Sequence, residues 1–229
     1  MTKPLKIACL LYFNIISYNK DRNSQMKGKS NQMIIPQAPS VKVVLLGDSG
    51  VGKTSIVSYF VTGKYPLKIP PTVGAAFITK KIHTEKGGYE LLIWDTSGEE
   101  AYRSLAPMYY RSASIAIVVC DVSQPETISS AVYWFDELKN NLGRNIVLAL
   151  CGNKLDLVKD EFKAKNEAEL EKVAADFDGV YITTSAIDGY NIDRLFQLVI
   201  DKYENEFAQK QPINRSMVIT ESSNDSQCC

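Results

Sequence analysis

The stretch at residues 41–63 reads VKVVLLGDSGVGKTSIVSYFVTG and determines the fold class of the domain that it opens. VKVVLL is a short apolar run rich in β-branched residues, which predicts a buried strand. In the last ten residues apolar side chains recur at helical spacing, and Gly63 is placed to end that helix. Residues 47–54 match G-x-x-x-x-G-K-[ST], which indicates a phosphate-binding loop when it joins a strand to a helix, as it does here.

The chemistry expected of this loop follows from its glycines and from its last residues. Glycines let backbone N–H groups point inward around phosphate oxygens, and the start of the helix adds the positive end of its dipole. Lys53 is expected to neutralise the β- and γ-phosphates, and the Thr54 hydroxyl to bind Mg²⁺. The alternative is a glycine-rich loop that only turns the chain. The residues predicted to bind the phosphates are Ser49, Gly50, Val51, Gly52, Lys53, Thr54 and Ser55.

The rest of the chain alternates strand-like and helix-like segments. The segment that ends at residue 142 carries one apolar face, and Ser123 with Glu126 is its predicted capping box. Strands are predicted at residues 41–46, 75–84, 89–95, 115–120, 145–151 and 180–185, and helices at 54–63, 123–142, 170–177 and 192–203. Lys86-Gly87-Gly88 lies between the second and third predicted strands and predicts that they form a β-hairpin. The expected fold is α/β and of the P-loop NTPase type, with a six-stranded, mostly parallel sheet, one antiparallel hairpin strand and helices on both faces.

The sequence NKLD follows directly on the fifth predicted strand, at the edge where ligands collect in open α/β sheets. Asp156 can accept hydrogen bonds from both N1–H and the exocyclic amine of guanine, whereas adenine presents an acceptor at N1. Asn153 is placed for the N7 edge of the purine, and the stem of Lys154 for the face of the base. Ser185 and Ala186, after the sixth strand, are expected to supply a backbone N–H to guanine O6. This set favours guanine and argues against a P-loop kinase or ATPase.

The sequence WDTSG ends the third predicted strand and completes the expected phosphate and metal site. Asp95 is expected to reach Mg²⁺ through water, and the Gly98 N–H to contact the γ-phosphate. Thr72, in the loop after the first helix, is the expected second hydroxyl ligand. The predicted cofactors are therefore GTP or GDP and Mg²⁺, with the metal held by Thr54, Thr72 and Asp95.

The composition argues against several other classes of protein. The formal net charge is zero, so nothing in it indicates binding to nucleic acid. The five cysteines show no ladder of spacings, which argues against a disulfide framework and for a reducing compartment. His83 is the one histidine and lies in an alternating, strand-like stretch, so neither a zinc site nor a Ser-His-Asp triad is expected. No apolar run reaches the length of a membrane span.

In order along the chain, GDSGVGKT, PTVGAAF, WDTSGEE, NKLD and TSA resemble the motifs of the Ras-like small GTPases. VGAAF, SLAPMYYR and IVVCDVS make the chain most similar to the Rab family and its early-endosome, Rab-five-type branch. The resemblance covers about residues 41–206 and implies a G domain that acts as a GTP-dependent switch in membrane trafficking. By matching position it implies that Tyr65 packs on the guanine edge, and that Phe77, Trp94 and Tyr109 form an aromatic effector patch. Core packing is the alternative for those three, above all for Trp94.

Two residues depart from the family pattern. Glu99 stands where these GTPases usually carry the glutamine that orients the attacking water. An ionised glutamate only accepts hydrogen bonds and brings negative charge near the γ-phosphate, so it either orients or deprotonates the water or weakens hydrolysis. The expected catalytic residues are Glu99, Lys53 and Gly98, and the alternative is a GTP-bound scaffold that does not hydrolyse. The second departure is Ile187, which replaces a lysine that usually follows TSA.

Cys228 and Cys229 end the chain and, in a Rab-like protein, resemble a geranylgeranylation signal. Two lipid chains give stable anchoring where one gives marginal binding. The resemblance implies effectors, an exchange factor, a GAP and a prenylation escort or GDI-type protein as partners. It also implies a location on the cytoplasmic face of endosomal or vesicle membranes, with cycling through the cytosol.

Three parts of the chain are expected. They are an N-terminal extension at 1–40 without sustained periodicity, a monomeric G domain at 41–206 and a flexible polar tail at 207–229. For the extension three alternatives stay open: a disordered or interfacial segment, a true start at Met26 or Met33, and a cleaved secretory signal.

Overall fold

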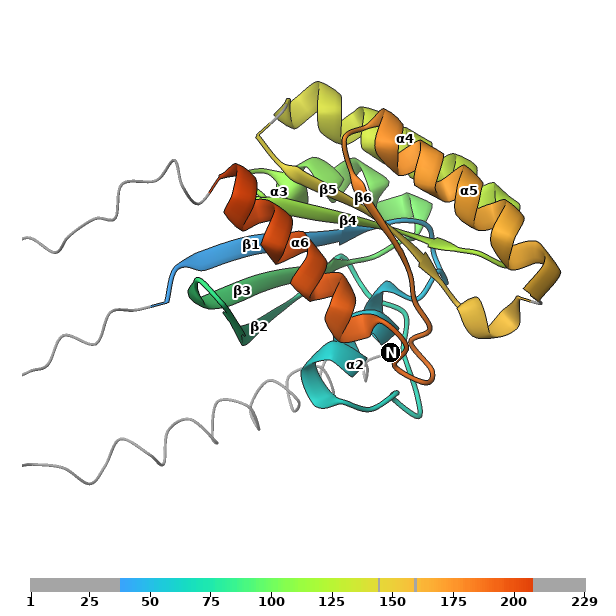
Figure 1. The fold of residues 1–229 in the computed structure, drawn as a ribbon, viewed down its shortest axis with the longest axis horizontal. Coiled ribbons are helices and arrows are strands. Elements are labelled where there is room, and N and C mark those ends of the chain that lie inside the picture. Colours follow the sequence, from blue (N-terminus) through green and yellow to red (C-terminus); the bar gives the residue numbers. More distant parts are fainter. Residues whose placement is uncertain (1–37, 144, 159, 208–229) are drawn as a thin grey trace, which may run out of the picture. The chain divides into compact units, whose positions relative to one another are not determined.

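The computed structural model of the chain describes residues 38–143, 145–158 and 160–207, and Figure 1 shows how their elements are arranged. These residues contain the predicted six-stranded sheet, and its strand order is β2-β3-β1-β4-β5-β6. The strands are β1 (Ser40–Leu46), β2 (Ala75–Thr84), β3 (Gly87–Thr96), β4 (Ile115–Asp121), β5 (Val147–Asn153) and β6 (Val180–Thr183). The fifth strand lies two residues further along than predicted, so Asn153 is its last residue.

The sheet is parallel except for its edge strand. β1 lies at the centre, between β3 and β4, and is buried along nearly its whole length. β2 pairs antiparallel with β3, with Ala75 opposite Thr96 at one end and Thr84 opposite Gly87 at the turn. Beyond the strands the pairing continues for one more hydrogen bond, in which the Ser97 N–H donates to the Gly74 carbonyl at 2.8 Å. This hydrogen bond joins the segment after β3 to the segment before β2, beside the candidate nucleotide-binding site.

Helices cover both faces of the sheet, as predicted, because successive residues of a strand point to opposite faces. α2 and α6 pack on one face, where the Phe60 and Phe196 rings stack with centroids 3.7 Å apart. α3, α4 and α5 cover the other face (Figure 1). The helices are α2 (Lys53–Thr62), α3 (Ala106–Tyr110), α4 (Pro125–Leu142), α5 (Asp160–Asp176) and α6 (Ile192–Glu206), with 3₁₀ turns η1 (Glu100–Leu105) and η2 (Leu155–Leu157).

Two local features differ from the expectations. The capping box predicted for Ser123 and Glu126 is wrong: α4 begins after Gln124, and no side chain of the described residues caps its end. The Ser123 hydroxyl donates instead to Asp121 Oδ1 at 2.6 Å, because a hydrogen bond to a carboxylate is stronger than one accepted from a neutral backbone N–H. The helical turns at 100–110 were not expected, because η1 and α3 are too short to show a helical period.

The two terminal parts of the prediction lie largely outside the described residues. These are the extension, up to residue 37, and the tail from residue 208, with Cys228 and Cys229. Along the described ranges, no helix has both the length and the apolar character that crossing a bilayer needs.

Candidate nucleotide-binding site

A cavity of about 540 Å³ opens at the carboxyl ends of the strands, a size that suits a nucleotide. Its walls come from the loop before α2, the loop before β2, the segment after β3 and the loops after β5 and β6. The predicted site residues that line it are Ser49, Gly50, Gly52, Lys53, Thr54, Ser55, Tyr65, Thr72, Gly98, Glu99, Asn153, Lys154, Asp156 and Ala186. Val51, Asp95 and Ser185 are buried immediately behind this lining.

The loop before α2 has the conformation that its glycines predict. Gly52 precedes the helix with φ +101°, a left-handed conformation that side chains disfavour. A Cβ at this position would also lie 2.2 Å from Asn153 Nδ2, so the residue has to be glycine for a second reason. The loop therefore turns tightly enough to bring β5 and the start of α2 together.

The Lys53 side chain is almost completely buried and folds back across the loop. Its ammonium group donates to the carbonyl oxygens of Gly47 and Asp48, each at 2.7 Å. Burial lowers the pKa of Lys53 to about 8, although the charges of Asp95 and Asp48 act in the opposite direction. The Lys53 ammonium group is therefore only partly protonated near pH 8, and it becomes fully charged when an anion binds beside it.

At pH 8, GDP binding is expected to take up roughly half a proton per chain, because Lys53 with a pKa of about 8 is half neutral and phosphate raises that pKa. The uptake should almost vanish near pH 6.5, where Lys53 is charged before binding as well. Calorimetry in two buffers of different ionisation enthalpy measures the proton count. Lys53→Arg is the matched control, because arginine stays charged, and uptake that persists in it would contradict the assignment.

The residues predicted to hold Mg²⁺ converge at one corner of the cavity. The Thr54 and Thr72 hydroxyl oxygens lie 2.9 Å apart, although the residues are 18 positions apart in the chain. Asp95 is buried at the end of β3, and its Oδ1 has no hydrogen-bond partner among the described residues. Burial raises the pKa of Asp95 to about 6, against a hydrogen bond from Thr54 and the charge of Lys53. An orphaned carboxylate oxygen beside two hydroxyls is a set of hard oxygen donors, so these residues fit Mg²⁺.

Gly98 and Glu99 follow β3 at the rim of the same corner. A Cβ on Gly98 would lie 2.3 Å from the Asp48 carbonyl group, so glycine is required for β3 to approach the phosphate loop. Glu99 lies next to it at the start of η1, and its side chain is exposed. Its backbone N–H donates to Ser97 Oγ at 3.3 Å. Within the described ranges, the Glu99 carboxylate makes no salt bridge, so it projects an uncompensated charge at the cavity mouth.

At the opposite end of the cavity, Asp156 is oriented by Ser185, whose hydroxyl donates to Asp156 Oδ1 at 2.8 Å. The Ser185 N–H donates to the Tyr190 carbonyl, so this residue acts through its side chain rather than through the predicted N–H. The Ala186 N–H lies 3.2 Å from Asn153 Oδ1 and lines the cavity. Tyr65, half-exposed, lines the cavity as well, as predicted.

Asn153 joins three segments of the site. Its side-chain nitrogen donates to the Val51 carbonyl at 2.9 Å, and its Oδ1 accepts from Thr184 Oγ1 at 3.1 Å and from the Ala186 N–H. An amide nitrogen carries two hydrogens, so one remains for the predicted bond to purine N7. Asn153 thus connects the phosphate loop to the loop after β6.

The sequence analysis missed two buried polar residues, Asp121 and Thr184. Asp121 ends β4 and contacts Lys154, and Thr184 follows β6 and contacts Asn153. Thr184 is the first residue of TSA and Asp121 lies in IVVCDVS, two stretches that carry the resemblance, but the sequence analysis assigned neither residue a role. A second signal was a polar residue at the end of an otherwise apolar strand, which is where parallel sheets place ligand contacts.

The three predicted effector residues form one row of aromatic rings on β2, β3 and α3. The Phe77 and Trp94 centroids are 5.4 Å apart, and those of Trp94 and Tyr109 are 6.0 Å apart. Phe77 is 41% exposed, whereas Trp94 and Tyr109 are half-buried and pack against the core on the α4 face. The Lys42 ammonium group lies 5.0 Å from the Trp94 ring. One side of the Trp94 ring therefore packs inward, as the core-packing alternative expects, and its role in binding effectors stays a prediction.

Ser185→Ala is expected to weaken GDP binding about threefold, since a hydrogen bond to a carboxylate that stays in place contributes about 1 kcal/mol or less when water can replace it. The measurement is a titration of the fluorescent nucleotide mant-GDP. Ser129→Ala, on the exposed side of α4 and away from the cavity, is the matched control. An unchanged affinity in Ser185→Ala would show that Asp156 does not need this partner.

Comparison with known proteins agrees with this geometry and confirms the predicted resemblance. The sequence pattern of the Ras family matches residues 42–205. The chain is 42% identical to the Ras-related protein Rab-22A of Homo sapiens over 156 residues, which cover 68% of this chain and 79% of that protein. It is 39% identical to the Ras-related protein Rab-31 of Homo sapiens over 171 residues, with coverages of 72% and 87%. It is 40% identical to the GTP-binding protein ypt5 of Schizosaccharomyces pombe over 184 residues, with coverages of 79% and 87%.

The predicted α/β fold, the guanine-nucleotide and Mg²⁺ cofactors and the GTPase activity thus agree with the family. The chain belongs to the Ras family and, within it, to the Rab small GTPases.

Proposed function

We propose that this Rab GTPase regulates vesicle-mediated transport at endosomal membranes by cycling between GTP- and GDP-bound forms. The observation that supports the proposal most strongly is that one cavity contains the two ends of a guanine-nucleotide site. Lys53 and the Thr54–Thr72 pair form the phosphate end, and Asp156, held by Ser185, forms the base end.

In this proposal the chain's residues divide the work of hydrolysis. Lys53 and the backbone of residues 49–55 bind the phosphates, while Thr54, Thr72 and Asp95 would hold Mg²⁺. The metal neutralises charge on the phosphates when it is bound. The Gly98 N–H contacts the γ-phosphate, and Glu99 accepts a hydrogen bond from the attacking water. This role is supported by the position of Glu99, which lines the cavity directly after Gly98.

At the base end, we assign guanine to the edge formed by Asp156, Ala186 and Asn153. Asp156 accepts from N1–H and the exocyclic amine, and the Ala186 N–H donates to O6 by sharing with or exchanging its contact to Asn153. The second amide hydrogen of Asn153 donates to N7. The stem of Lys154 covers one face of the base, and Tyr65 packs at its edge.

The aromatic row of Phe77, Trp94 and Tyr109 is the surface we propose for effectors. It lies on the hairpin and α3, directly beside the segments that contact the γ-phosphate and the metal, so the bound nucleotide can control its shape. An exchange factor, a GAP and a GDI-type escort are the further proposed partners. Geranylgeranylation of Cys228 and Cys229 is the proposed anchor, and the cycle includes a cytosolic form bound to the escort.

Two experiments test the proposal at its two levels. Denaturing the purified full chain and identifying the released nucleotide by chromatography should give GDP or GTP, and adenine nucleotides would instead support a P-loop kinase or ATPase. In cells, the full chain should fractionate with endosomal membranes, and a Cys228→Ser, Cys229→Ser variant should become cytosolic. Membrane association that survives this change would contradict the lipid anchor.

The non-hydrolysing scaffold is not favoured. The chain belongs to a family of GTPases, and Glu99 is the one predicted catalytic position at which its residue departs from that family's pattern.

A further inference from the structure

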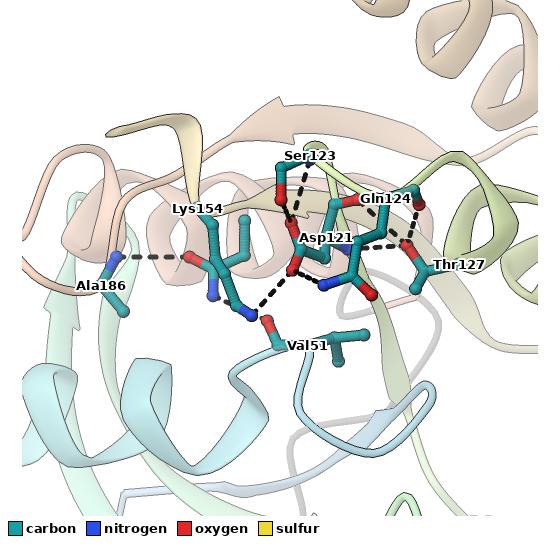
Figure 2. Close-up of polar contacts among 8 residues, drawn as sticks. Val51, Asp121, Ser123, Gln124, Thr127, Lys154 and Ala186 are labelled. Atoms are coloured by element: carbon teal, nitrogen blue, oxygen red, sulfur yellow. Dashed lines mark hydrogen bonds and ion pairs between the residues drawn. The ribbon is translucent and has the colours of Figure 1, made fainter. Parts of the chain in front are cut away.

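Asp121 is a buried carboxylate whose oxygens are fully engaged (Figure 2). It is the last residue of β4 and is 1% exposed. Its Oδ1 accepts from the backbone N–H and the hydroxyl of Ser123, at 2.9 and 2.6 Å. Its Oδ2 accepts from Gln124 Nε2 at 2.9 Å and from the ammonium group of Lys154 at 2.7 Å. Asp121 is therefore fixed by the start of α4 and in turn contacts a residue that lines the cavity.

The backbone around Asp121 is rigid as well. The Thr127 hydroxyl accepts from the Asp121 N–H at 3.0 Å and lies at hydrogen-bond distance from the carbonyls of Asp121 and Gln124. This ties the end of β4 to the first turn of α4 at the position where the carboxylate projects. The Asp121 carboxylate therefore has a fixed position, and the ion pair forms only when the Lys154 side chain reaches that position.

Lys154 is held in an unusual conformation at the edge of the cavity. Its backbone has φ +66° and ψ +38°, in the left-handed region that residues other than glycine rarely adopt. Its side chain is 28% exposed and lies between Asn153 and Asp156 in the cavity wall. The far end of this side chain contacts Asp121, so both ends of Lys154 are fixed and its methylene stem spans the distance between them.

Burial alone would raise the pKa of the Asp121 carboxyl, but hydrogen bonds from Lys154 and Ser123 and the positive charge of Lys154 outweigh it. The pKa of Asp121 therefore lies below its ordinary value, and the group is an anion at neutral pH. A buried anion that loses its cation is strongly unfavourable, so the contact is persistent rather than occasional.

We propose that Asp121 is a positioning residue for the nucleotide: it anchors the ammonium group of Lys154 so that the lysine stem is held in place across the guanine base. The inference rests on the proposed placement of the base in this cavity. A free lysine samples many rotamers, and ordering it when the nucleotide binds costs entropy. Here the ion pair orders the Lys154 side chain before the nucleotide binds, so binding loses less side-chain entropy. The complex is therefore more stable, and the nucleotide should be released more slowly.

The test is a double-mutant cycle on the full chain with mant-GDP release as the readout. Asp121→Asn keeps the shape and removes the charge, and it should accelerate release about fivefold. Lys154→Met keeps an apolar stem without the ammonium group and should accelerate release to a similar extent. In the Lys154→Met background, Asp121→Asn should add nothing, because the residue acts through the lysine. A multiplicative effect in the double variant would overturn the inference.

A second readout separates positioning from a general structural role. The single-turnover rate constant for hydrolysis of already bound GTP should be the same in Asp121→Asn and in the unaltered chain, because Lys154 lies at the base end. A general loosening of the fold would change both rates and would overturn the inference. Gln124→Ala is the matched control, since it removes a bond to the same oxygen without touching Lys154. If it accelerated release as much as Asp121→Asn, the start of α4 and not the ion pair would be responsible.

The cycle also distinguishes this inference from the proposed site itself. If Lys154→Ala, which removes the stem, leaves mant-GDP release unchanged, Lys154 does not contact the nucleotide and the base placement fails. If Lys154→Ala accelerates release while Lys154→Met or Asp121→Asn does not, the base placement stands and the positioning role of Asp121 fails. Should Asp121→Asn not fold, the comparison of Lys154→Met with the double variant still decides, because equal release rates are required. Replacing both members of a buried pair is tolerated better than removing one.

Discussion

Replacing Asp156 by asparagine is expected to lower the affinity for GDP by about a thousandfold and to raise the affinity for xanthosine diphosphate. Asp156 is the proposed acceptor for two guanine donors, and hydrogen bonds to a charged group contribute about 1.5–3 kcal/mol each, so the loss of both is worth about 4 kcal/mol. Xanthine carries a carbonyl in place of the exocyclic amine. The asparagine amide can donate to that carbonyl and accept from N1–H, which restores complementarity.

Competition of GDP and xanthosine diphosphate against mant-GDP measures this exchange. The variant is isosteric, and Ser185 can still donate to the side-chain oxygen at position 156, so the loop geometry is preserved. Asp188→Asn, in the exposed loop after β6, is the matched control that makes the same chemical change away from the base and should leave both affinities unaltered. A GDP affinity in Asp156→Asn within a factor of about three of the unaltered chain would place the base elsewhere.

The second large effect is expected from Glu99→Gln, which should accelerate single-turnover hydrolysis of bound GTP by on the order of tenfold to a hundredfold. Two like charges about 6 Å apart at an effective dielectric constant of about 20 repel each other by about 3 kcal/mol, which bounds the cost of the carboxylate beside the γ-phosphate. Within the described part of the chain no cation neutralises Glu99. Glutamine removes the charge and adds a donor, so it can bind the water and the phosphate together.

Rapid-quench measurement of phosphate release from GTP-loaded chain follows this rate. Glu99→Ala separates the two contributions, because it removes the charge without supplying an amide, and its rate should fall between those of the unaltered chain and Glu99→Gln. Glu100→Gln is the matched control, since it neutralises the neighbouring exposed carboxylate, which does not line the cavity. A slower rate in Glu99→Gln would show that the carboxylate itself takes the proton of the attacking water.

Most of the fold could be predicted because its elements are locally encoded. The buried strands β1, β4 and β5 are continuous apolar runs, which only a sheet covered on both faces uses. The helical turns at residues 100–110 could not be predicted in this way. They are short, none of the side chains of η1 is buried, and their position depends on the Gly98 approach to the phosphate loop, which is a tertiary contact.

The candidate site also contains residues that local sequence predicts and residues whose role depends on tertiary contacts. Residues whose chemistry is carried by neighbours in sequence, such as Lys53 and Thr54, are predicted correctly as cavity residues. The roles of Asp121 and Thr184 were missed because each contacts a residue at the end of β5 or directly after it, about 30 positions away, which becomes a neighbour only when β4, β5 and β6 align. For the pair Ser185 and Ala186 the sequence could not tell which N–H is available, and the structure shows that the Tyr190 carbonyl accepts from the Ser185 N–H, whereas Ala186 lines the cavity.

The β2–β3 hairpin has a consequence for how this chain can change in length during evolution. Its antiparallel register runs without a bulge from the turn at Thr84 and Gly87 to the Gly74–Ser97 hydrogen bond, beside Thr72 and Asp95. One residue inserted in a single strand would turn every side chain on one side of the insertion to the opposite face of the sheet. It would also move Thr72 away from Asp95, and both are proposed to hold Mg²⁺. One residue added to each strand at the turn leaves the other end intact. Length variation should therefore be tolerated at the turn and eliminated by selection elsewhere in the hairpin.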